Sequence, residues 1–553
     1  MTVRIAIEPG GAVREVPAGT PAWDIVADPS FPRTAFPLVA VLVNNEVVGL
    51  EHSLVVNATI APVDLGGRAG VNIYRKSLCF LLAMAARHVF PKRRLVIGHS
   101  LGQSYLYWFD GMEGVPDGDI ARIEARMREL VAGDLPIRSL LLSYSEAVEY
   151  FAKHNQPDTA LLLANRSAPE VRVHSCGGTL DLWHGPLVPS TGLLPVFAIL
   201  SFAPGFLLRY PPAEDPLRVA PFNENPVLSS IYREYKNWGK ILRVGSVGSL
   251  NELIREGGIQ EFIQIAEALQ DKKIAEIADR ISARRDSVKV VLIAGPSSSG
   301  KTTFSKKLMI QLRVVGRNPV TISLDDYFKP MAETPRDEEG KPDFESLGAL
   351  DVELLNDQLV RLLRGEEVET PLFDFLSGSR KQRGKPMRLP DRAILILEGI
   401  HGLNDALTPL VDREAKYKIY VSALTQLNLD DHNRIATTDN RLIRRLVRDN
   451  QFRGHPALRT LSMWASVRRG EDRNIFPFQN SADSAFNSAL DYELAVLKVY
   501  ADPLLATVKP DAPEYQDARA LLAFLSNFTP LHPRWVPSTS ILREFIGESA
   551  FKY

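Results

Sequence analysis

The sequence predicts a multidomain α/β protein whose C-terminal region is built on a parallel β-sheet with helices on both faces. From residue 288 onward, short apolar strands alternate with amphipathic helices, which is the pattern of strand–helix–strand units. A glycine-rich loop joins the first of these strands to a helix. Before residue 213, strands and helices are mixed less regularly, which predicts two smaller α+β domains.

The N-terminal elements follow from local patterns. Residues 36–48 read as two strands joined by a tight turn at Asn44-Asn45. Apolar side chains at helical spacing predict a helix over residues 73–90. Prolines interrupt the apolar stretch 192–208, so we expect a buried, strand-rich core there and not a membrane span, which needs ~20 apolar residues.

Shifts in composition divide the 553 residues into several segments, as expected at ~100–200 residues per domain. The middle segment is polar and helical and is expected to connect its neighbours, and the last is a C-terminal extension. The predicted boundaries are 1–66, 67–212, 213–286, 287–505 and 506–553.

The charge balance and cysteine usage narrow the classes of function. Lys and Arg total 65 against 66 Asp and Glu, which argues against a dedicated nucleic-acid coat. Two cysteines, Cys79 and Cys176, provide neither a disulfide framework nor an all-thiolate metal site, and they fit a reducing compartment. The first residues lack a basic segment followed by an apolar run, so we expect no secretory signal and a cytoplasmic location.

Residues 295–302 read GPSSSGKT and lie between an apolar strand, 289–294, and a helix predicted from Thr302 to Val315. The glycines let successive backbone N–H groups face phosphate oxygens, and the helix N-terminus adds partial positive charge. Lys301 can reach the β- and γ-phosphates of a nucleotide, and the Thr302 hydroxyl can hold Mg²⁺. The motif therefore predicts ATP and Mg²⁺ without identifying the reaction. The predicted nucleotide-binding set is Gly295, Ser297, Ser298, Ser299, Gly300, Lys301, Thr302 and Thr303.

Two further strands end in carboxylates. The strand at 320–324 runs into Asp325-Asp326, and the strand at 394–397 ends at Glu398. In an open α/β sheet, ligands bind at the carboxyl ends of the strands. Asp325 is therefore a candidate general base for an attacking hydroxyl, and Glu398 is a candidate to act on Mg²⁺ through water. A helix cap, a solvated loop or a solvated strand end is the alternative reading of these acids.

Five motifs occur in one order: GPSSSGKTT, SLDDYF, PLFDF followed by Ser377 and Arg380, LEGIHGL, and RLIRRLVRD. Together they resemble the uridine kinase and phosphoribulokinase family of P-loop kinases over about residues 288–500. The resemblance implies that Asp325 is the catalytic base and that residues 344–351 bind the acceptor ribose. The substrate contacts that it implies are Asp325, Phe328, Phe344, Glu345, Phe373, Arg380 and Arg441.

This chain departs from the nucleoside kinases of that family near the acceptor. Glu345 stands where those kinases have Asp, and Phe373 and Gly378 stand where they have Tyr and His. The last two changes remove polar groups that would read a pyrimidine. We therefore expect an apolar, roomier base pocket, and the acceptor stays open.

Residues 431–473 contain ten arginines against five acids, and four of the arginines recur at helical spacing. A solvated helix face or a nucleic-acid patch is one reading of this pattern. The family resemblance implies a mobile lid, in which Arg444 and Arg448 stabilise the transferring phosphoryl group. The four arginines at helical spacing are Arg441, Arg444, Arg445 and Arg448.

The N-terminal half resembles threonyl-tRNA synthetases. Residues 1–66 resemble the TGS domain of these enzymes. Their second accessory domain is resembled by three segments, YRKSLCFLL, LVIGHSLGQSYLYWFDG and SCGGTL. The editing site of that domain uses three His and one Cys. Lys76, Phe80 and Leu180 stand where the histidines would be, and Cys176 is retained. Zinc binding and editing are therefore not expected. Nucleic-acid binding is not expected either, because residues 1–70 contain four Arg, no Lys and seven acids and so lack the cations that bind phosphates.

The order of these domains resembles a bacterial class of fused nucleoside-kinase-like proteins. It implies transfer of the ATP γ-phosphoryl group to a hydroxyl of a nucleoside or a related sugar-containing metabolite. Alternatives are a kinase of a sugar phosphate or pantothenate, an RNA-linked regulator that uses ATP as a switch, and a tRNA deacylase. The expected partner is a small-molecule acceptor without a membrane, and assembly into a homo-oligomer stays open.

Overall fold

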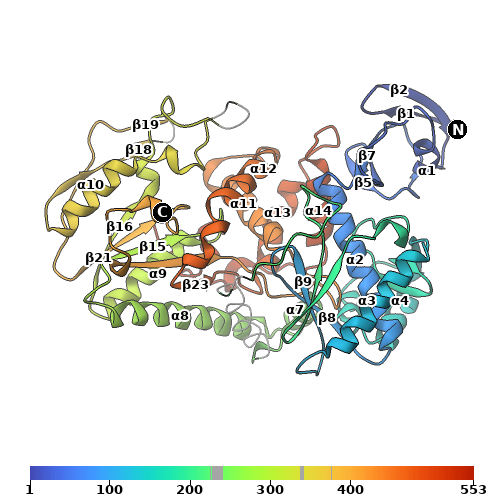
Figure 1. The fold of residues 1–553 in the computed structure, drawn as a ribbon, viewed down its shortest axis with the longest axis horizontal. Coiled ribbons are helices and arrows are strands. Elements are labelled where there is room, and N and C mark those ends of the chain that lie inside the picture. The colour runs from blue at the N-terminus through green and yellow to red at the C-terminus, as the bar shows by residue number, and fades with distance from the viewer. Residues whose placement is uncertain (225, 227–240, 337–339, 341, 375–376, 553) are drawn as a thin grey trace.

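The computed structural model describes residues 1–224, 226, 241–336, 340, 342–374 and 377–552. The chain runs from a small N-terminal domain, through a second domain, to a larger domain that holds a parallel sheet (Figure 1). The N-terminus lies at one end of the molecule and the C-terminus lies beside the parallel sheet (Figure 1). Part of the predicted connector and Phe375 of the PLFDF motif lie outside the described residues.

The first domain is a five-stranded sheet in the order β2-β1-β7-β4-β5, and α1 packs on it. Ile5, Val41 and Ile60 are fully buried in its core. Asn44 and Asn45 have φ angles of 50° and 60°, the left-handed conformation that tight hairpin turns need, so the predicted turn is confirmed. The elements are β1 (Thr2–Ile7), β2 (Ala12–Pro17), β3 (Thr20–Pro21), α1 (Ala22–Val26), β4 (Leu38–Val43), β5 (Glu46–Val48), β6 (Ser53–Leu54) and β7 (Ala58–Asp64).

The second domain contains two antiparallel sheets, β13-β14-β9-β8 and β10-β11-β12. The predicted helix over residues 73–90 is confirmed as α2. The apolar stretch 192–208 forms strands from residue 198 onward; the strand that begins at Gly205 is buried, as expected, whereas the strand over residues 198–202 is partly exposed. The elements are α2 (Arg68–Val89), β8 (Leu95–Ser100), β9 (Ser104–Phe109), α3 (Asp117–Ala132), β10 (Arg138–Ser143), α4 (Tyr144–Lys153), α5 (Pro157–Ala164), β11 (Glu170–Cys176), β12 (Thr179–Leu182), β13 (Ala198–Phe202) and β14 (Gly205–Arg209).

The C-terminal sheet has the order β16-β21-β15-β22-β23, and every neighbouring pair is parallel. Side chains alternate across β15: Val291 and Ile293 join a core shared with α8 and α9, whereas Val290 and Leu292 join a core shared with α10. The predicted parallel sheet with helices on both faces is therefore confirmed. Its strands are β15 (Val290–Ala294), β16 (Asn318–Ser323), β21 (Ala393–Glu398), β22 (Lys416–Ser422) and β23 (Ser484–Asn487).

Around this sheet lie the long helices and two short antiparallel ladders, β17-β20 and β18-β19. The remaining elements are α7 (Val247–Arg255), α8 (Ile259–Ala283), α9 (Lys301–Val314), the 3₁₀ turn η2 (Leu324–Tyr327), α10 (Val352–Leu363), β17 (Val368–Thr370), β18 (Phe373–Asp374), β19 (Ser379–Arg380), β20 (Lys385–Met387), α11 (Thr437–Arg453), α12 (Ala457–Asn474), α13 (Glu493–Leu505), α14 (Tyr515–Leu525) and α15 (Arg543–Ile546).

The connector is part of the C-terminal core. Ile274 and Ile277 of α8 are fully buried in the same cluster as Leu308 of α9.

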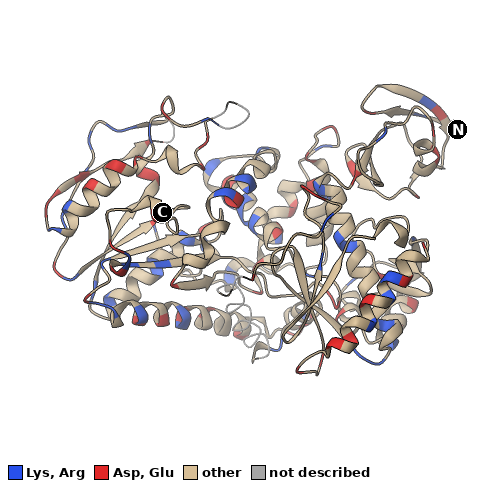
Figure 2. Ribbon diagram, viewed as in Figure 1, with Lys and Arg blue, Asp and Glu red and all other residues tan. Residues whose placement is uncertain are grey.

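Lys/Arg and Asp/Glu residues are interspersed along α8 and α3 (Figure 2). Across the described ranges, no helix is both long enough and apolar enough to span a membrane.

Candidate active site

Two glycines shape the loop between β15 and α9. A Cβ at Gly295 would lie 1.9 Å from the carbonyl oxygen of Val421 on β22, so no side chain fits there. Gly300 has a φ of +79°, and a Cβ on it would lie 2.6 Å from the Ile541 side chain. Ser298 also has a positive φ of 58°. These conformations wrap the loop backbone around the N-terminus of α9, where N–H groups can face an anion.

The Lys301 side chain folds back over this loop. Its Nζ donates hydrogen bonds to the carbonyl oxygens of Gly295, at 2.9 Å, and Pro296, at 3.1 Å. Desolvation lowers the pKa of Lys301, and the nearby carboxylate of Glu398 acts in the opposite direction. The ammonium group is therefore held within the loop that the sequence assigns to phosphates.

The predicted magnesium residues lie together. The Thr302 Oγ1 donates a hydrogen bond of 2.8 Å to Oε1 of Glu398. The two meet because β15 and β21 are adjacent and parallel, so their carboxyl ends share one edge of the sheet. Burial raises the pKa of Glu398 to about 7, against the lowering effect of Lys301. A hydroxyl and a carboxylate are oxygen ligands that suit Mg²⁺ in phosphoryl-transfer sites.

The two aspartates after β16 have different surroundings. Asp325 is exposed, whereas Asp326 is half-buried and its Oδ1 accepts a hydrogen bond of 3.3 Å from the backbone N–H of Phe373. Although the residue is accessible to solvent, the protein groups around its carboxyl desolvate it enough to raise the pKa of Asp325, and Lys301 acts in the opposite direction. Asp325 is thus the carboxylate that a bound acceptor could approach.

The serines of the loop provide a test of fit to a phosphate ligand. The side-chain hydroxyls of Ser298 and Ser299 are buried, and neither has a hydrogen-bond partner within the described part of the chain. Buried polar groups normally find a partner, and an orphaned one calls for an explanation. Phosphate oxygens are strong acceptors for such hydroxyls, so the loop chemistry fits a nucleotide.

Three predicted acceptor residues form an aromatic cluster. The ring centroid of Phe328 lies 5.6 Å from that of Phe344 and 5.7 Å from that of Phe373. A Cβ at Gly378 would lie 3.1 Å from the Met331 side chain, so Met331 already takes part of the space near that glycine. The cluster gives this region an apolar wall.

Glu345 lies beside this wall and next to helix α12. A Cβ at Gly470 would lie 2.6 Å from the Glu345 side chain, so the two chain segments are in close contact. Burial, and then repulsion from Glu471, raises the pKa of Glu345 to about 7. Its charge therefore changes near neutral pH.

Arg380 is held by protein groups. Its guanidinium donates to Oδ2 of Asp351 at 3.0 Å, and to the carbonyl oxygens of Tyr327 at 3.1 Å and Phe328 at 3.0 Å. These bonds tie β19 to the turn after Asp325-Asp326. The predicted contact of Arg380 with substrate stays a prediction.

Two arginines of α11, Arg441 and Arg444, face the phosphate loop and not solvent. Arg441 and Arg444 have exposed fractions of 1% and 0%, so a solvated helix face is wrong for these two. Arg441 Nε donates to the carbonyl oxygen of Ser297, and Arg444 Nη1 donates to that of Ser298, both at 3.3 Å. Buried carboxylates balance them: Glu471 pairs with Arg441, and Glu493 pairs with Arg444.

The next two arginines of α11 differ in their contacts. Arg445 Nη1 donates to the Ser297 hydroxyl at 2.8 Å. Arg448 pairs with Asp449 at 2.9 Å and lies near enough to Lys301 to lower its pKa. Arg444 thus contacts the loop backbone and Arg448 lies near Lys301, and the catalytic role predicted for the two stays a prediction.

The C-terminal extension also reaches the loop, which sequence reasoning missed. Glu544 Oε2 accepts hydrogen bonds from the Thr303 backbone N–H at 3.0 Å and from the Thr303 hydroxyl at 2.7 Å. Ile541 packs against Gly300. Glu544 and Thr303 are 241 positions apart, and no local pattern signals such a contact.

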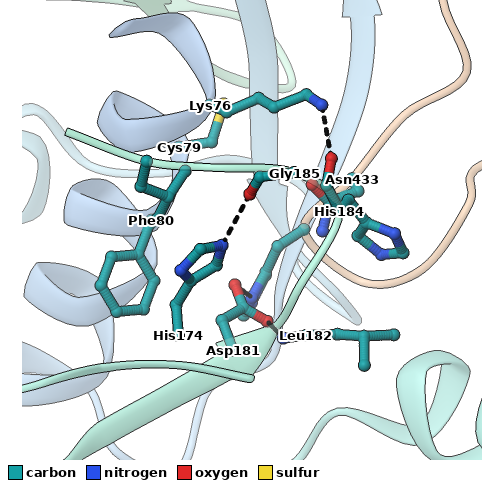
Figure 3. A pocket seen from close by; sticks show the side chains of 11 residues that line it. Lys76, Cys79, Phe80, His174, Asp181, Leu182, His184, Gly185 and Asn433 are labelled. Atoms are coloured by element: carbon teal, nitrogen blue, oxygen red, sulfur yellow. Dashed lines mark hydrogen bonds and ion pairs between the residues drawn. The ribbon is translucent and has the colours of Figure 1, made fainter. Parts of the chain in front are cut away.

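In the second domain, the residues that replace an editing site line or border a small pocket between α2 and β12. Lys76 Nζ donates to the carbonyl oxygen of His184 at 2.6 Å, and His174 Nε2 lies 3.0 Å from that of Gly185 (Figure 3). Phe80 and Cys79 line the same pocket. Within the described ranges, no group of three or more His, Cys, Asp or Glu residues is placed to hold a metal ion.

The loop before α11 closes this pocket. His184 Nε2 lies 2.7 Å from Oδ2 of Asp430, and His432 Nδ1 lies 3.0 Å from Oδ2 of Asp181. Burial alone would lower the pKa of His432, but Asp181 raises it to about 9, so the His432 imidazole is protonated at neutral pH. Polar groups of the second domain thus hold the segment that leads into the arginine helix.

Comparisons with known proteins match two separate regions of the chain. Residues 290–495 match the Phosphoribulokinase / Uridine kinase family, so the C-terminal region carries a domain of this family. The N-terminal region matches threonine–tRNA ligases: that of Carboxydothermus hydrogenoformans is 30% identical over 196 residues, which are 35% of this chain and 31% of the ligase. That of Desulforamulus reducens is 33% identical over 196 residues, 35% of this chain and 30% of the ligase.

The chain thus spans about a third of the length of these curated relatives. Among solved structures, D-glycerate 3-kinase from Cryptococcus neoformans var. grubii is similar with a TM-score of 0.23 and 15% identity. The match covers 46% of this chain and 87% of that one.

Proposed function

We propose that this protein transfers the γ-phosphoryl group of ATP to a hydroxyl group of a sugar-containing metabolite, with a nucleoside as the first candidate. The observation that carries the proposal is the Thr302–Glu398 hydrogen bond beside Lys301, at the edge of the sheet where Asp325 also lies. Phosphoryl transfer needs a lysine in the phosphate loop, oxygen ligands for Mg²⁺ and an accessible carboxylate.

Each residue has a role in this proposal. Backbone N–H groups of the loop and the Lys301 ammonium bind the phosphates of ATP. Mg²⁺, when bound, neutralises phosphate charge, and the Thr302 hydroxyl and Glu398 would hold it. Asp325 accepts the proton of the acceptor hydroxyl as its oxygen attacks the γ-phosphorus, and ADP leaves. Arg444 and Arg448 balance the charge on the transferring group.

The acceptor side supports a sugar-like molecule with loose base recognition. Glu345 can accept hydrogen bonds from two neighbouring hydroxyls when it is ionised. The wall of Phe328, Phe344 and Phe373 offers apolar contact without a hydrogen-bonding group. An apolar site discriminates weakly, whereas a hydrogen-bonding site can reject an analogue by ~10⁴–10⁵-fold. We therefore expect the enzyme to accept more than one base, or a different sugar-containing acceptor.

For the N-terminal half we propose a regulatory or assembly role and no chemistry on RNA. Lys76, Phe80 and Leu180 provide none of the imidazoles that the editing site of the related ligases uses. The pocket that remains is closed by the loop that contains Asp430 and His432. This contact links the half to the phosphoryl-transfer site.

The test is a screen of nucleosides, sugars, sugar phosphates and pantothenate for acceptor-dependent release of ADP from Mg·ATP. We expect one class of sugar-containing acceptors to stimulate ADP release at least several-fold over the rate without acceptor. Strict preference for uridine and cytidine over all purine nucleosides would contradict the loose base pocket. No stimulation by any class would contradict the kinase assignment.

A further inference from the structure

Two carboxylates bind the phosphate loop from outside the kinase-family motifs. Glu544 accepts from the backbone N–H and the hydroxyl of Thr303, as described above. Glu471 accepts a hydrogen bond of 2.9 Å from the backbone N–H of Ser297. Donors at both ends of the loop, next to the orphaned hydroxyls of Ser298 and Ser299, are therefore occupied by negatively charged groups of the chain itself.

The segment that carries Glu544 is docked in place. Ile541, Leu542 and Phe545 are fully buried in the core that also contains α9. Arg543 donates to the carbonyl oxygens of Pro533, at 3.0 Å, and Val536, at 2.8 Å, which closes the segment on itself. The Phe545 ring lies 4.9 Å from the Arg444 guanidinium. Glu544 thus reaches Thr303 from a folded support that also contacts an arginine of α11.

Thr303 lies in the first turn of α9, where N–H groups without a helical partner bind anions. A carboxylate and a nucleotide phosphate cannot both take the same two donors. Glu544 also lies close enough to Lys301 to raise its pKa, and to Glu398 to raise that of the carboxyl, so its charge acts on both ends of the site. Nucleotide phosphates would meet this negative charge as they approach.

We propose that the C-terminal segment 536–548 is a built-in competitor for the nucleotide and that Glu544 sets the affinity of the loop for ATP. The inference rests on the proposed function, because it assigns the loop to nucleotide phosphates. Binding of ATP then requires Glu544 to leave Thr303. The apparent dissociation constant for ATP equals the intrinsic constant divided by the fraction of molecules in which the loop is free, so a smaller free fraction gives weaker binding.

The alternative is that Glu544 is only a cap for α9. The two alternatives predict different effects of Glu544→Gln on ATP binding. If Glu544 competes with the nucleotide, Glu544→Gln removes the charge of the competing group and ATP binds more tightly. Charged hydrogen bonds are roughly twice as strong as neutral ones, which predicts a dissociation constant about 10-fold lower. If Glu544 is only a cap, the same change weakens α9, and ATP binds equally well or less well.

The experiment measures binding of a non-hydrolysable Mg·ATP analogue to the full-length protein by calorimetry, for the wild type, Glu544→Gln and Glu548→Gln. Glu548 is the matched control because it lies in the same segment, its side chain is 85% exposed and it pairs with Arg543 and not with the loop. We expect about 10-fold tighter binding for Glu544→Gln and an unchanged constant for Glu548→Gln. Unchanged or weaker binding by Glu544→Gln overturns the proposal.

Hydrogen exchange of the wild-type protein provides a second measurement that needs no variant to fold. We expect the analogue to speed exchange in residues 536–548 while it slows exchange in the loop 295–303. Slower exchange in both regions overturns the competition. Absence of analogue binding by all three proteins overturns the proposed function as well, whereas normal binding with no effect of Glu544→Gln overturns only this inference.

Discussion

Asp325 and Asp326 show how neighbouring residues of one type acquire different chemistry. The carboxylate of Asp326 binds the backbone of Phe373, whereas Asp325 remains exposed near Lys301. The motif Asp-Asp after a strand predicts that one of them acts on substrate, and the family resemblance selects Asp325. In the structure Asp326 makes a contact with the backbone, and the choice of Asp325 as the base stays a prediction.

We expect Asp325→Asn to bind Mg·ATP normally and to transfer the phosphoryl group at least ~10²-fold more slowly, the usual effect of removing a general base. The control is Asp326→Asn, which keeps a side-chain oxygen that can accept from Phe373 and should retain most of the turnover. Steady-state kinetics with the best acceptor measures both. An active Asp325→Asn with an inactive Asp326→Asn would show that the other carboxylate is the base.

If Glu345 binds the acceptor as proposed, acceptor binding should depend on pH. Its pKa is raised to about 7, so the carboxyl is protonated below pH 7 and becomes a charged acceptor of hydroxyl hydrogen bonds above it. We therefore expect the KM for the acceptor to fall as the pH rises through about 7. Glu345→Gln should flatten this dependence, and the exposed Glu353→Gln on α10 should not. A KM that rises with pH in the wild type would contradict the assignment of Glu345.

At the scale of elements, α11 combines a predictable helix with unpredictable partners. The spacing of its arginines predicts the helix, because residues three and four apart share a face. The burial of Arg441 and Arg444 could not be predicted, because their counter-ions, Glu471 and Glu493, come from α12 and α13. The strand–loop–helix around Lys301 could be predicted, since its residues are contiguous. Glu544 could not, because tertiary packing alone brings it to the loop.

Removing one partner of a buried ion pair leaves the other charge uncompensated. Arg444→Met leaves the buried Glu493 without its ion-pair partner. We therefore expect it to lower the free energy of unfolding of the C-terminal domain by about 3–5 kcal/mol. Arg453→Met on the same helix is the control, because the Arg453 side chain is 52% exposed, and its loss should cost ~1 kcal/mol or less. Urea unfolding followed by tryptophan fluorescence measures the difference. Equal stabilities of the two variants would show that the Arg444–Glu493 pair is not a stabilising contact.

At the scale of the whole molecule, the second domain and the kinase-family domain share an ionic contact. Asp181 and His184 hold the loop at Asp430 and His432, a few residues before α11 begins. The resemblance of each half to a known family predicts the order of the domains. The resemblances could not predict this contact. One partner of each pair lies in the region that resembles a tRNA ligase and the other in the kinase-family domain, so neither family by itself contains both partners. We therefore expect a change in the second domain to affect the arginines that border the phosphate loop.

We expect Asp181→Asn to lower kcat of the kinase several-fold while the KM for ATP changes little, because the loop before α11 loses a charged partner and the phosphate loop itself is unchanged. Asp134→Asn, in the same domain but away from this contact, is the control. A kcat equal to that of the wild type for Asp181→Asn would show that the contact holds the domains together without affecting catalysis.

The central claim is that the loop around Lys301 transfers the γ-phosphoryl group of ATP. The most direct test incubates γ-labelled Mg·ATP with the acceptor found in the screen and identifies the phosphorylated product by mass spectrometry, for the wild type and for Lys301→Ala with an unchanged circular dichroism spectrum. We expect labelled product from the wild type and a rate lower by several orders of magnitude for Lys301→Ala. Labelled product at the wild-type rate from folded Lys301→Ala would contradict it.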